Sequence, residues 1–232
     1  EKGILQADIL TLPWWGMVPY RPCAKGAVVF GERASFLAKM AFNESQQNLS
    51  TKNEKPTFYV ISQRALLTPV PPADYVKSLV FTIKKGQAFD PTIIAEKLSE
   101  LGYLRVPRVT VRGEFTLRGE VLDIFMPGEE FAHRIVFDFD EVEQIKSFNP
   151  ETQSSIENID SLLIYPMKEV IWKDELVSKL EEKIKSRKDL SEYDFSSYLT
   201  ELMVSHESEG EELLYPLLWQ SEEKSIFQNS VL

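Results

Sequence analysis

The sequence predicts an α/β protein made of more than one domain. Short apolar runs, such as residues 58–61, are typical of buried strands. Apolar residues four positions apart, as at Leu176, Leu180 and Ile184, are typical of an amphipathic helix. Of the 232 residues, 43% are hydrophobic, which is ample for a core, and the prolines clustered within residues 69–72 predict a domain boundary there.

The first segment is predicted to form a strand, a helix and a second strand. Residues 9–12 are apolar, and the proline and tryptophans that follow predict a loop, because proline cannot donate into a central sheet. Trp14 and Trp15 could offer a stacking platform for a base or sugar, but the favoured interpretation is that they pack the loop onto the core. We expect a helix from about residue 25 to 42 and a surface loop over 43–55.

Beyond the proline cluster, residues 79–83 predict a strand, and local chemistry then predicts a helix with defined ends. Asp90 is a good N-cap, Pro91 suits the first helical position, and Gly102 can end the helix. We expect its buried stripe to consist of apolar residues at helical spacing: Ile93, Ile94, Leu98 and Leu101. The helix leads directly into an arginine-rich stretch.

That stretch, residues 102–128, is the candidate functional surface. Its arginines alternate with apolar residues, so strand geometry should point them away from the core: Arg105, Arg108, Arg112 and Arg118. Gly113 and Gly119 bracket Phe115 and predict tight turns or bulges. Arginine pairs bidentately with carboxylates, which favours a protein-docking face. A merely solvated strand face, with surface pairs worth ~0–1 kcal/mol each, is equally consistent with the pattern.

The remainder predicts a hairpin followed by helices. Residues 133–139 and 142–148 read as two strands joined by a short turn, with His133 on a strand. After residues 162–166 the pattern changes to that of two helices, of which the first begins with acidic residues that complement the helix dipole, Asp174 and Glu175. The apolar segment 213–219 should be covered by other elements, and His206 should lie at a helix end.

Composition argues against several classes of function. A net charge of −10 argues against a general nucleic-acid binder, and one cysteine with two histidines cannot form a zinc cluster of usual spacing. No glycine-rich phosphate loop is present, so no nucleotide or other cofactor is expected. Four acidic residues near 140 could bind a divalent cation or form a carboxylate pair, but strand alternation separates them: Asp138, Asp140, Glu141 and Glu143. The single cysteine and the lack of a long apolar run predict a cytoplasmic protein without a membrane partner.

Several motifs resemble the amino-terminal, UvrB-like module of bacterial transcription-repair coupling factors. They are Gly-Tyr-Leu-Arg-Val at 102–106, Gly-Glu-Phe-Thr-Leu-Arg-Gly at 113–119, Asp-Ile-Phe with Pro-Gly at 123–128, and the segment 137–154. Leu-Pro-Trp at 12–14 resembles the preceding part of the same family. The resemblance covers most of the chain.

The resemblance implies a degenerate, discontinuous, helicase-like (RecA-like) parallel-sheet domain made of residues 1–72 and 163–232. A smaller α+β domain that binds UvrA, residues 73–162, is inserted between them. The implied contacts with UvrA are Arg105 and Arg118, with Phe115 and Thr116 beside them. UvrB has a further arginine where this chain has Thr116.

The function implied is that of a non-catalytic adaptor that mimics UvrB and recruits UvrA to lesions where transcription has stalled. The family's translocase motor and RNA polymerase-binding domain have no counterpart in these residues. RNA polymerase and DNA are therefore expected as partners only through other domains. The alternative is a UvrB-like module that binds damaged DNA or hydrolyses ATP in response to nucleic acid.

Overall fold

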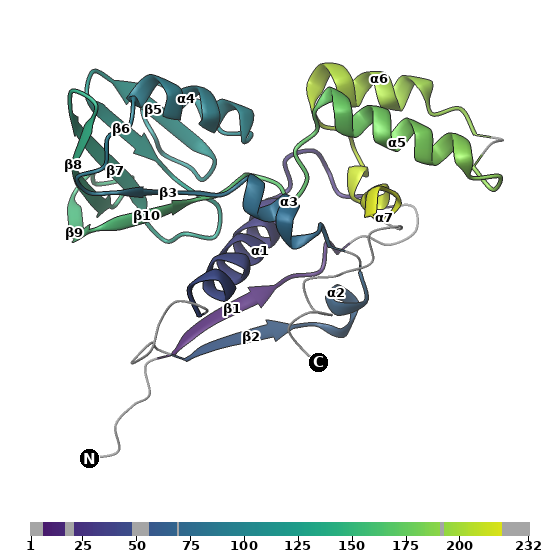
Figure 1. The fold of residues 1–232 in the computed structure, drawn as a ribbon, viewed down its shortest axis with the longest axis horizontal. Helices are drawn as coiled ribbons and strands as arrows, with labels where there is room; N and C mark the ends of the chain where they lie inside the picture. The colour runs from purple at the N-terminus through teal and green to yellow at the C-terminus, as the bar shows by residue number, and fades with distance from the viewer. Residues whose placement is uncertain (1–6, 17–20, 48–55, 69, 191–192, 220–232) are drawn as a thin grey trace, which may run out of the picture. The chain divides into compact units, whose positions relative to one another are not determined.

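The computed structural model describes residues 7–16, 21–47, 56–68, 70–190 and 193–219. The chain divides into two compact units (Figure 1). Unit 1 combines Glu1–Val76 with Glu169–Leu232, and unit 2 is Lys77–Lys168. Both parallel and antiparallel strand pairs are present, which confirms a mixed α/β architecture. The assignment of functional domains and the RecA-like topology stay predictions.

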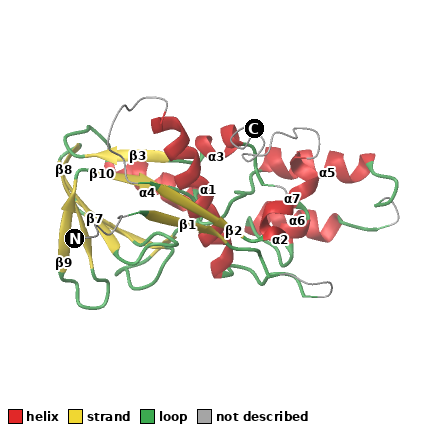
Figure 2. Ribbon diagram, turned by 90° about the horizontal axis from the view of Figure 1, so that it is seen from below, coloured by secondary structure: helices red, strands yellow, loops and turns green. Residues whose placement is uncertain are grey.

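Unit 1 begins with a parallel strand–helix–strand unit. Strand β1 (Asp8–Leu12) pairs in parallel with β2 (Thr57–Ile61), and helix α1 (Val28–Gln47) connects them and lies beside β1 (Figure 2). Two short helices follow, α2 (Gln63–Leu67) and α3 (Ala73–Ser78), the second of which runs into unit 2.

The second segment of unit 1 is helical, as the sequence predicts. Helix α5 (Asp174–Ser186) begins with its two acidic residues in the first turn, and α6 (Ser196–Ser205) ends at His206, which adopts a left-handed conformation. The 3₁₀ turn η1 (Glu211–Leu213) and α7 (Tyr215–Trp219) complete the segment. The core of unit 1 joins residues from both segments: Trp15, Phe30, Trp172, Leu180, Leu202, Tyr215 and Leu218. The packing interpretation is therefore confirmed for Trp15.

Two predictions about the first segment are wrong. The strand at residues 58–61 exists, but Phe58 is 57% and Val60 51% exposed, because the sheet in the described part of the chain has only two strands. Helix α1 continues beyond residue 42 through Gln47, since no proline or glycine stops it there. Residues 48–55, the rest of the expected surface loop, lie outside the described residues.

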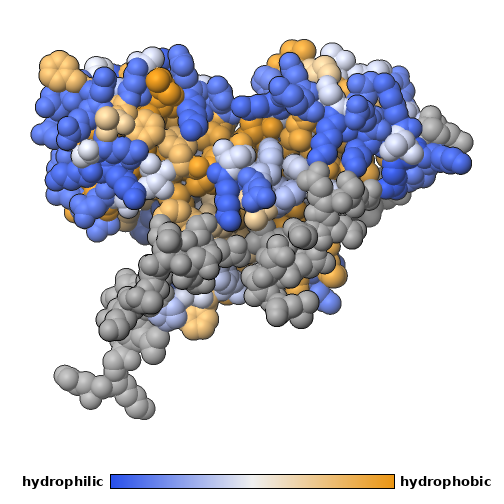
Figure 3. All heavy atoms as spheres, in the orientation of Figure 1, coloured by the Kyte–Doolittle hydropathy of each residue, from blue (hydrophilic) through white to orange (hydrophobic). Residues whose placement is uncertain are grey.

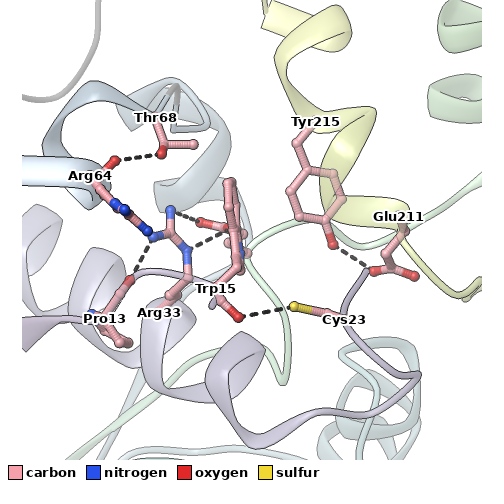
Figure 4. A network of polar contacts seen from close by, with 9 residues as sticks. Pro13, Trp15, Cys23, Arg33, Arg64, Thr68, Glu211 and Tyr215 are labelled. Carbon is pink, nitrogen blue, oxygen red and sulfur yellow. Dashed lines mark hydrogen bonds and ion pairs between the residues drawn. The ribbon is translucent and has the colours of Figure 1, made fainter. Parts of the chain in front are cut away.

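The two segments of unit 1 are joined by a buried ion pair. Arg33 donates from Nε to Glu169 Oε1 at 2.9 Å and from Nη2 to Oε2 at 3.1 Å, and both side chains are fully buried. Arg33 Nη1 also donates to the Pro13 carbonyl at 2.8 Å, and the guanidinium lies 4.0 Å from the centre of the Trp15 ring (Figure 4). A second link is the hydrogen bond from Cys23 N to Glu212 Oε1, 2.8 Å.

Unit 2 is built on a six-stranded sheet in which β4 to β9 are neighbours in chain order. Its strands are β4 (Leu104–Arg105), β5 (Glu114–Arg118), β6 (Val121–Ile124), β7 (Ala132–Asp138), β8 (Glu141–Phe148) and β9 (Ser155–Ile159). The β4–β5 pair is parallel and the others are antiparallel. A separate antiparallel pair joins β3 (Phe81–Lys84) to β10 (Ser161–Ile164). The predicted hairpin is confirmed as β7–β8.

Helix α4 (Pro91–Glu100) forms where local chemistry predicts it. The Asp90 side chain accepts a hydrogen bond from Thr92 N at 2.7 Å, and Gly102 follows the helix with φ +91°. The predicted buried stripe holds for Ile94, whereas Ile93 is 57% exposed. Neighbouring helical positions differ by about 100° in direction, so the two isoleucines cannot both face the sheet.

A candidate docking surface on unit 2

Arg105 and Arg118 lie on strands at one side of the six-stranded sheet. Strand β4 is an edge strand; its Arg105 pairs in register with Phe115, and Val106 N donates to Phe115 O at 2.9 Å. Arg105 is exposed. Arg118 ends β5, and its side chain is 60% exposed. In Figure 3, hydrophilic residues cover much of the visible face of unit 2.

Phe115 and Thr116 are positioned differently from what the sequence suggests. Phe115 is fully buried and Thr116 is 3% exposed, so neither side chain is available to a partner. Both belong to β5, where Phe115 lies opposite Ile124 and Thr116 lies opposite Asp123. Their contribution is therefore to hold the strand that ends at Arg118, and not to contact a partner directly.

A buried carboxylate, Asp123, lies between two arginines. Arg134 binds it through two hydrogen bonds, from Nε to Oδ1 at 2.6 Å and from Nη2 to Oδ2 at 2.7 Å. Arg118 Nη2 lies 3.8 Å from Oδ2 of the same carboxylate. The hydrogen bonds that Arg134 donates to Asp123 raise the pKa of Arg134 above its ordinary value, so the guanidinium of Arg134 stays charged. Two guanidinium groups thus share one carboxylate, which leaves a net positive charge beside the exposed end of Arg118.

Arg134 has further contacts that fix its position. Its Nη2 donates to Gln153 Oε1 at 3.1 Å, and its guanidinium lies 4.7 Å from the centre of the Phe148 ring. The side chain of Arg134 is only 22% exposed. Because Arg134 is held on three sides, it keeps the Asp123 carboxylate in place. The position of that carboxylate in turn limits where the Arg118 side chain can lie.

Sequence reasoning missed Asp123 and Arg134 as a pair. Asp123 lies on a strand between the apolar residues Leu122 and Ile124, a pattern that indicates that its side chain points to the other face of the sheet from theirs. Arg134 lies between His133 and Ile135, so it has an apolar neighbour on one side only. What the sequence does not contain is the β6–β7 register that places Asp123 directly opposite Arg134.

The loop between β4 and β5 is held by Glu114. Its carboxylate oxygen Oε2 accepts hydrogen bonds from Thr110 N at 2.7 Å and from Val111 N at 2.9 Å. Partial burial raises the pKa of Glu114, but these backbone donors together with the Thr110 hydroxyl lower it overall, so the carboxylate stays ionised. Gly113 has φ +90°, a conformation that residues with a Cβ rarely adopt, so the loop favours glycine at this position. A Cβ there would also lie 2.7 Å from Cε at the flexible end of Met167, which would have to shift.

Arg108 and Arg112 lie in this loop as exposed neighbours, as predicted. Arg112 Nε donates to the Glu129 carbonyl at 2.8 Å, and Arg108 Nη2 reaches the Glu151 carbonyl at 3.4 Å. Both contacts are to backbone oxygens, so neither guanidinium charge is neutralised by them.

Two structural features are absent from the part of the chain that the structure describes. Within it, no three His, Cys, Asp or Glu side chains are grouped so that they could hold a metal ion. Among the same residues, no helix is both long and apolar enough to cross a membrane. Of the acidic residues near 140, Asp140 lies in the β7–β8 turn and the others lie on the strands beside it, and all of them are exposed.

Comparisons with known proteins connect unit 2 to a family. Residues 81–170, nearly all of unit 2, match the family model described as the UvrB interaction domain. The chain is 33% identical over 219 residues to the transcription-repair-coupling factor of Borreliella burgdorferi, covering 94% of this chain and 18% of that protein. It is 37% identical over 139 residues to the transcription-repair-coupling factor of Bacillus subtilis, covering 60% of this chain and 12% of that protein.

A UvrB protein is also similar. The chain is 33% identical over 141 residues to the UvrABC system protein B of Kosmotoga olearia, covering 61% of this chain and 20% of that protein. The resemblance to transcription-repair-coupling factors and to UvrB that the sequence motifs indicate is confirmed. The chain spans about a fifth or less of the length of these curated relatives.

Proposed function

We propose that this chain is a non-catalytic adaptor module of transcription-coupled nucleotide excision repair that recruits UvrA through a surface of unit 2 centred on Arg105 and Arg118. The observation that carries the proposal is that the family match, residues 81–170, coincides with the unit whose sheet exposes these two arginines. The partner side of the interface would supply carboxylates, because a guanidinium binds a carboxylate through two parallel hydrogen bonds.

Unit 1 would then be the degenerate, RecA-like UvrB-homology domain, interrupted by the UvrA-binding domain. The parallel pair β1–β2 with its connecting helix α1 is compatible with this role. The sequence has no glycine-rich phosphate loop, so we propose no nucleotide chemistry for it. Any contact with RNA polymerase or DNA is assigned to other parts of the longer relatives.

The electrostatics of the surface favour recognition by Arg118 over Arg134. Arg134 is committed to Asp123 by two short hydrogen bonds, whereas Arg118 touches the same carboxylate only at 3.8 Å and keeps 60% of its side chain in water. A partner carboxylate can therefore replace water around Arg118 without first breaking a strong internal pair. Reversing its charge should slow association and, where the pair is buried in the complex, cost about 2–5 kcal/mol.

The test is a calorimetric titration of purified UvrA with the chain and with the double variant Arg105→Glu/Arg118→Glu, at about 0.15 M salt to suppress long-range effects. The control, Arg108→Glu/Arg112→Glu, has the same change in net charge on the same unit. We expect the first variant to lose measurable binding and the control to keep most of it. Equal affinities for the parent and the first variant would show that the docking face lies elsewhere.

A second candidate function is binding of damaged DNA or nucleic-acid-dependent ATP hydrolysis, which the resemblance to UvrB would imply. The net charge of −10 and the absence of a phosphate loop from the sequence argue against it. Binding of labelled ATP or of a lesion-containing duplex at moderate salt would favour this function over the adaptor role.

A further inference from the structure

The tip of the β7–β8 hairpin carries an exposed aromatic residue in an unfavourable backbone conformation. Asp138 pairs with Glu141, so Phe139 and Asp140 are the two central residues of the turn. Phe139 has φ +53°, in the left-handed region where a Cβ clashes with the backbone. Its side chain is 80% exposed, so the ring gains little from packing within the protein.

The neighbouring hairpin shows what this position normally requires. In the β5–β6 turn, Arg118 pairs with Val121, and the first central residue is Gly119 with φ +57°. Glycine adopts this conformation without steric cost. Gln153 also has a positive φ, +62°, but its side chain binds Arg134 and the Pro150 carbonyl. Phe139 has no comparable packing, so folding alone does not account for it.

The two turns lie at the same end of the sheet. Val121, which follows the β5–β6 turn, pairs with Val136, and Phe137 N donates to the Glu120 carbonyl at 2.8 Å. Phe139 comes two residues after Phe137. The aromatic tip is therefore continuous with the end of β5 that carries Arg118.

The charges around the tip are mainly acidic. The exposed carboxylates belong to residues on both sides of Phe139: Asp138, Asp140, Glu141 and Glu143. Lys84 and Lys85 lie on the adjoining turn, where Gly86 N donates to Val142 O at 2.8 Å. An apolar ring among four carboxylates and two lysines fits an apolar pocket with basic side chains at its rim.

We infer that Phe139 is an apolar anchor of the docking surface and inserts into a pocket bordered by lysine or arginine side chains on the protein that Arg118 contacts. The inference rests on the proposed function, since it takes UvrA as that protein. The docking surface would then have two parts: the positively charged arginines, and an apolar ring surrounded by negatively charged carboxylates. Aromatic side chains that become buried when two proteins bind often contribute most of the affinity of the interface.

The test uses Phe139→Gly in the whole chain, because glycine suits the positive φ and the variant should fold. We expect its affinity for UvrA to fall at least about tenfold, while its melting temperature stays the same or rises by about 2–4 °C. The matched control is Ile156→Ala, which removes an exposed apolar side chain from the far edge strand of the same sheet and should leave affinity within about twofold of the parent. Asp140→Asn/Glu141→Gln should weaken binding more at low salt than at high salt.

Failure of this inference is distinguishable from failure of the proposed function. If Phe139→Gly binds UvrA within about threefold of the parent while Arg105→Glu/Arg118→Glu does not bind, the anchor is refuted and the arginine surface stands. A lowered melting temperature for Phe139→Gly would assign the ring a folding role and would also overturn the inference. If the parent chain itself does not bind UvrA, the proposed function fails, and the anchor with it.

Discussion

Removal of Arg33 from the buried ion pair of unit 1 should be one of the most destabilising single changes in this protein. Arg33 lies on α1, in the first segment of the unit, and Glu169 begins the second. The pair is fully buried, and Arg33 makes three hydrogen bonds, two to Glu169 and one to the Pro13 carbonyl. Arg33→Met keeps much of the aliphatic volume but leaves the carboxylate without its counter-charge.

The expected cost follows from this geometry. Removing one partner of a buried ion pair costs about 3–5 kcal/mol, because the other charge stays buried and uncompensated. The orphaned Pro13 carbonyl adds to that loss. Against a typical total stability of about 5–15 kcal/mol, unit 1 of the variant should be largely unfolded by mild denaturant.

Tryptophan fluorescence can follow this unit alone. All four tryptophans belong to it: Trp14, Trp15, Trp172 and Trp219. Urea titrations monitored at the tryptophan emission therefore report the free energy of unfolding of unit 1 without a signal from unit 2. The double variant Arg33→Met/Glu169→Leu should recover most of the loss, since no buried charge remains.

The loss should depend on pH with a defined sign. Burial raises the pKa of Glu169 above its ordinary value of 4.5, although Arg33 partly lowers it. The folded state therefore holds the proton more tightly than the unfolded chain, and the contribution of Glu169 to stability falls as pH rises above about 4.5 towards the folded pKa. Without Arg33 this pKa rises further, so Arg33→Met should be more destabilising at pH 8 than at pH 5. A loss below about 1 kcal/mol, or an equal loss at both pH values, would show that the buried carboxylate of Glu169 does not depend on Arg33 for its charge compensation.

Three further predictions concern single positions. Asp123→Asn replaces the carboxylate to which Arg134 donates two hydrogen bonds by a weaker acceptor. The free energy of unfolding, measured by thermal unfolding followed by circular dichroism, should therefore fall by about 1–3 kcal/mol, and UvrA should bind more weakly. If both quantities are unchanged, the pair does not support the surface. Gly113→Ala places a Cβ 2.7 Å from Met167 Cε at φ +90° and should cost about 1–3 kcal/mol in the same assay. Burial, and to a smaller extent the negative charge of Glu212, raises the pKa of the Cys23 thiol to about 11. Below pH 9, iodoacetamide should therefore alkylate Cys23 much more slowly in the folded protein than in the urea-unfolded chain. Similar rates in the two states would contradict the buried position of this thiol.

Elements set by local chemistry could be predicted from the sequence. The N-cap at Asp90, the glycine after α4 and the β7–β8 hairpin all depend on residues within a few positions of one another. Burial could be predicted less well. The apolar strand β2 is exposed in the described structure, and Phe115 and Thr116, which the family resemblance places beside the contact arginines, are buried. Whether a strand is buried depends on the elements that pack against it, and the residue pattern of the strand alone does not contain that information.

The sequence alone predicts the types of most elements, shows the acidic charge that argues against nucleic-acid binding, and points to the two arginines on which the proposed surface is centred. Which side chains share a site depends on the tertiary structure. Strand alternation assigns residues to two faces, but the β6–β7 register is what brings Asp123 opposite Arg134, and the β5–β6 pairing is what brings it near Arg118. In the same way, only packing brings Arg33 to Glu169, 136 positions along the chain, because no local interaction encodes a contact between distant segments.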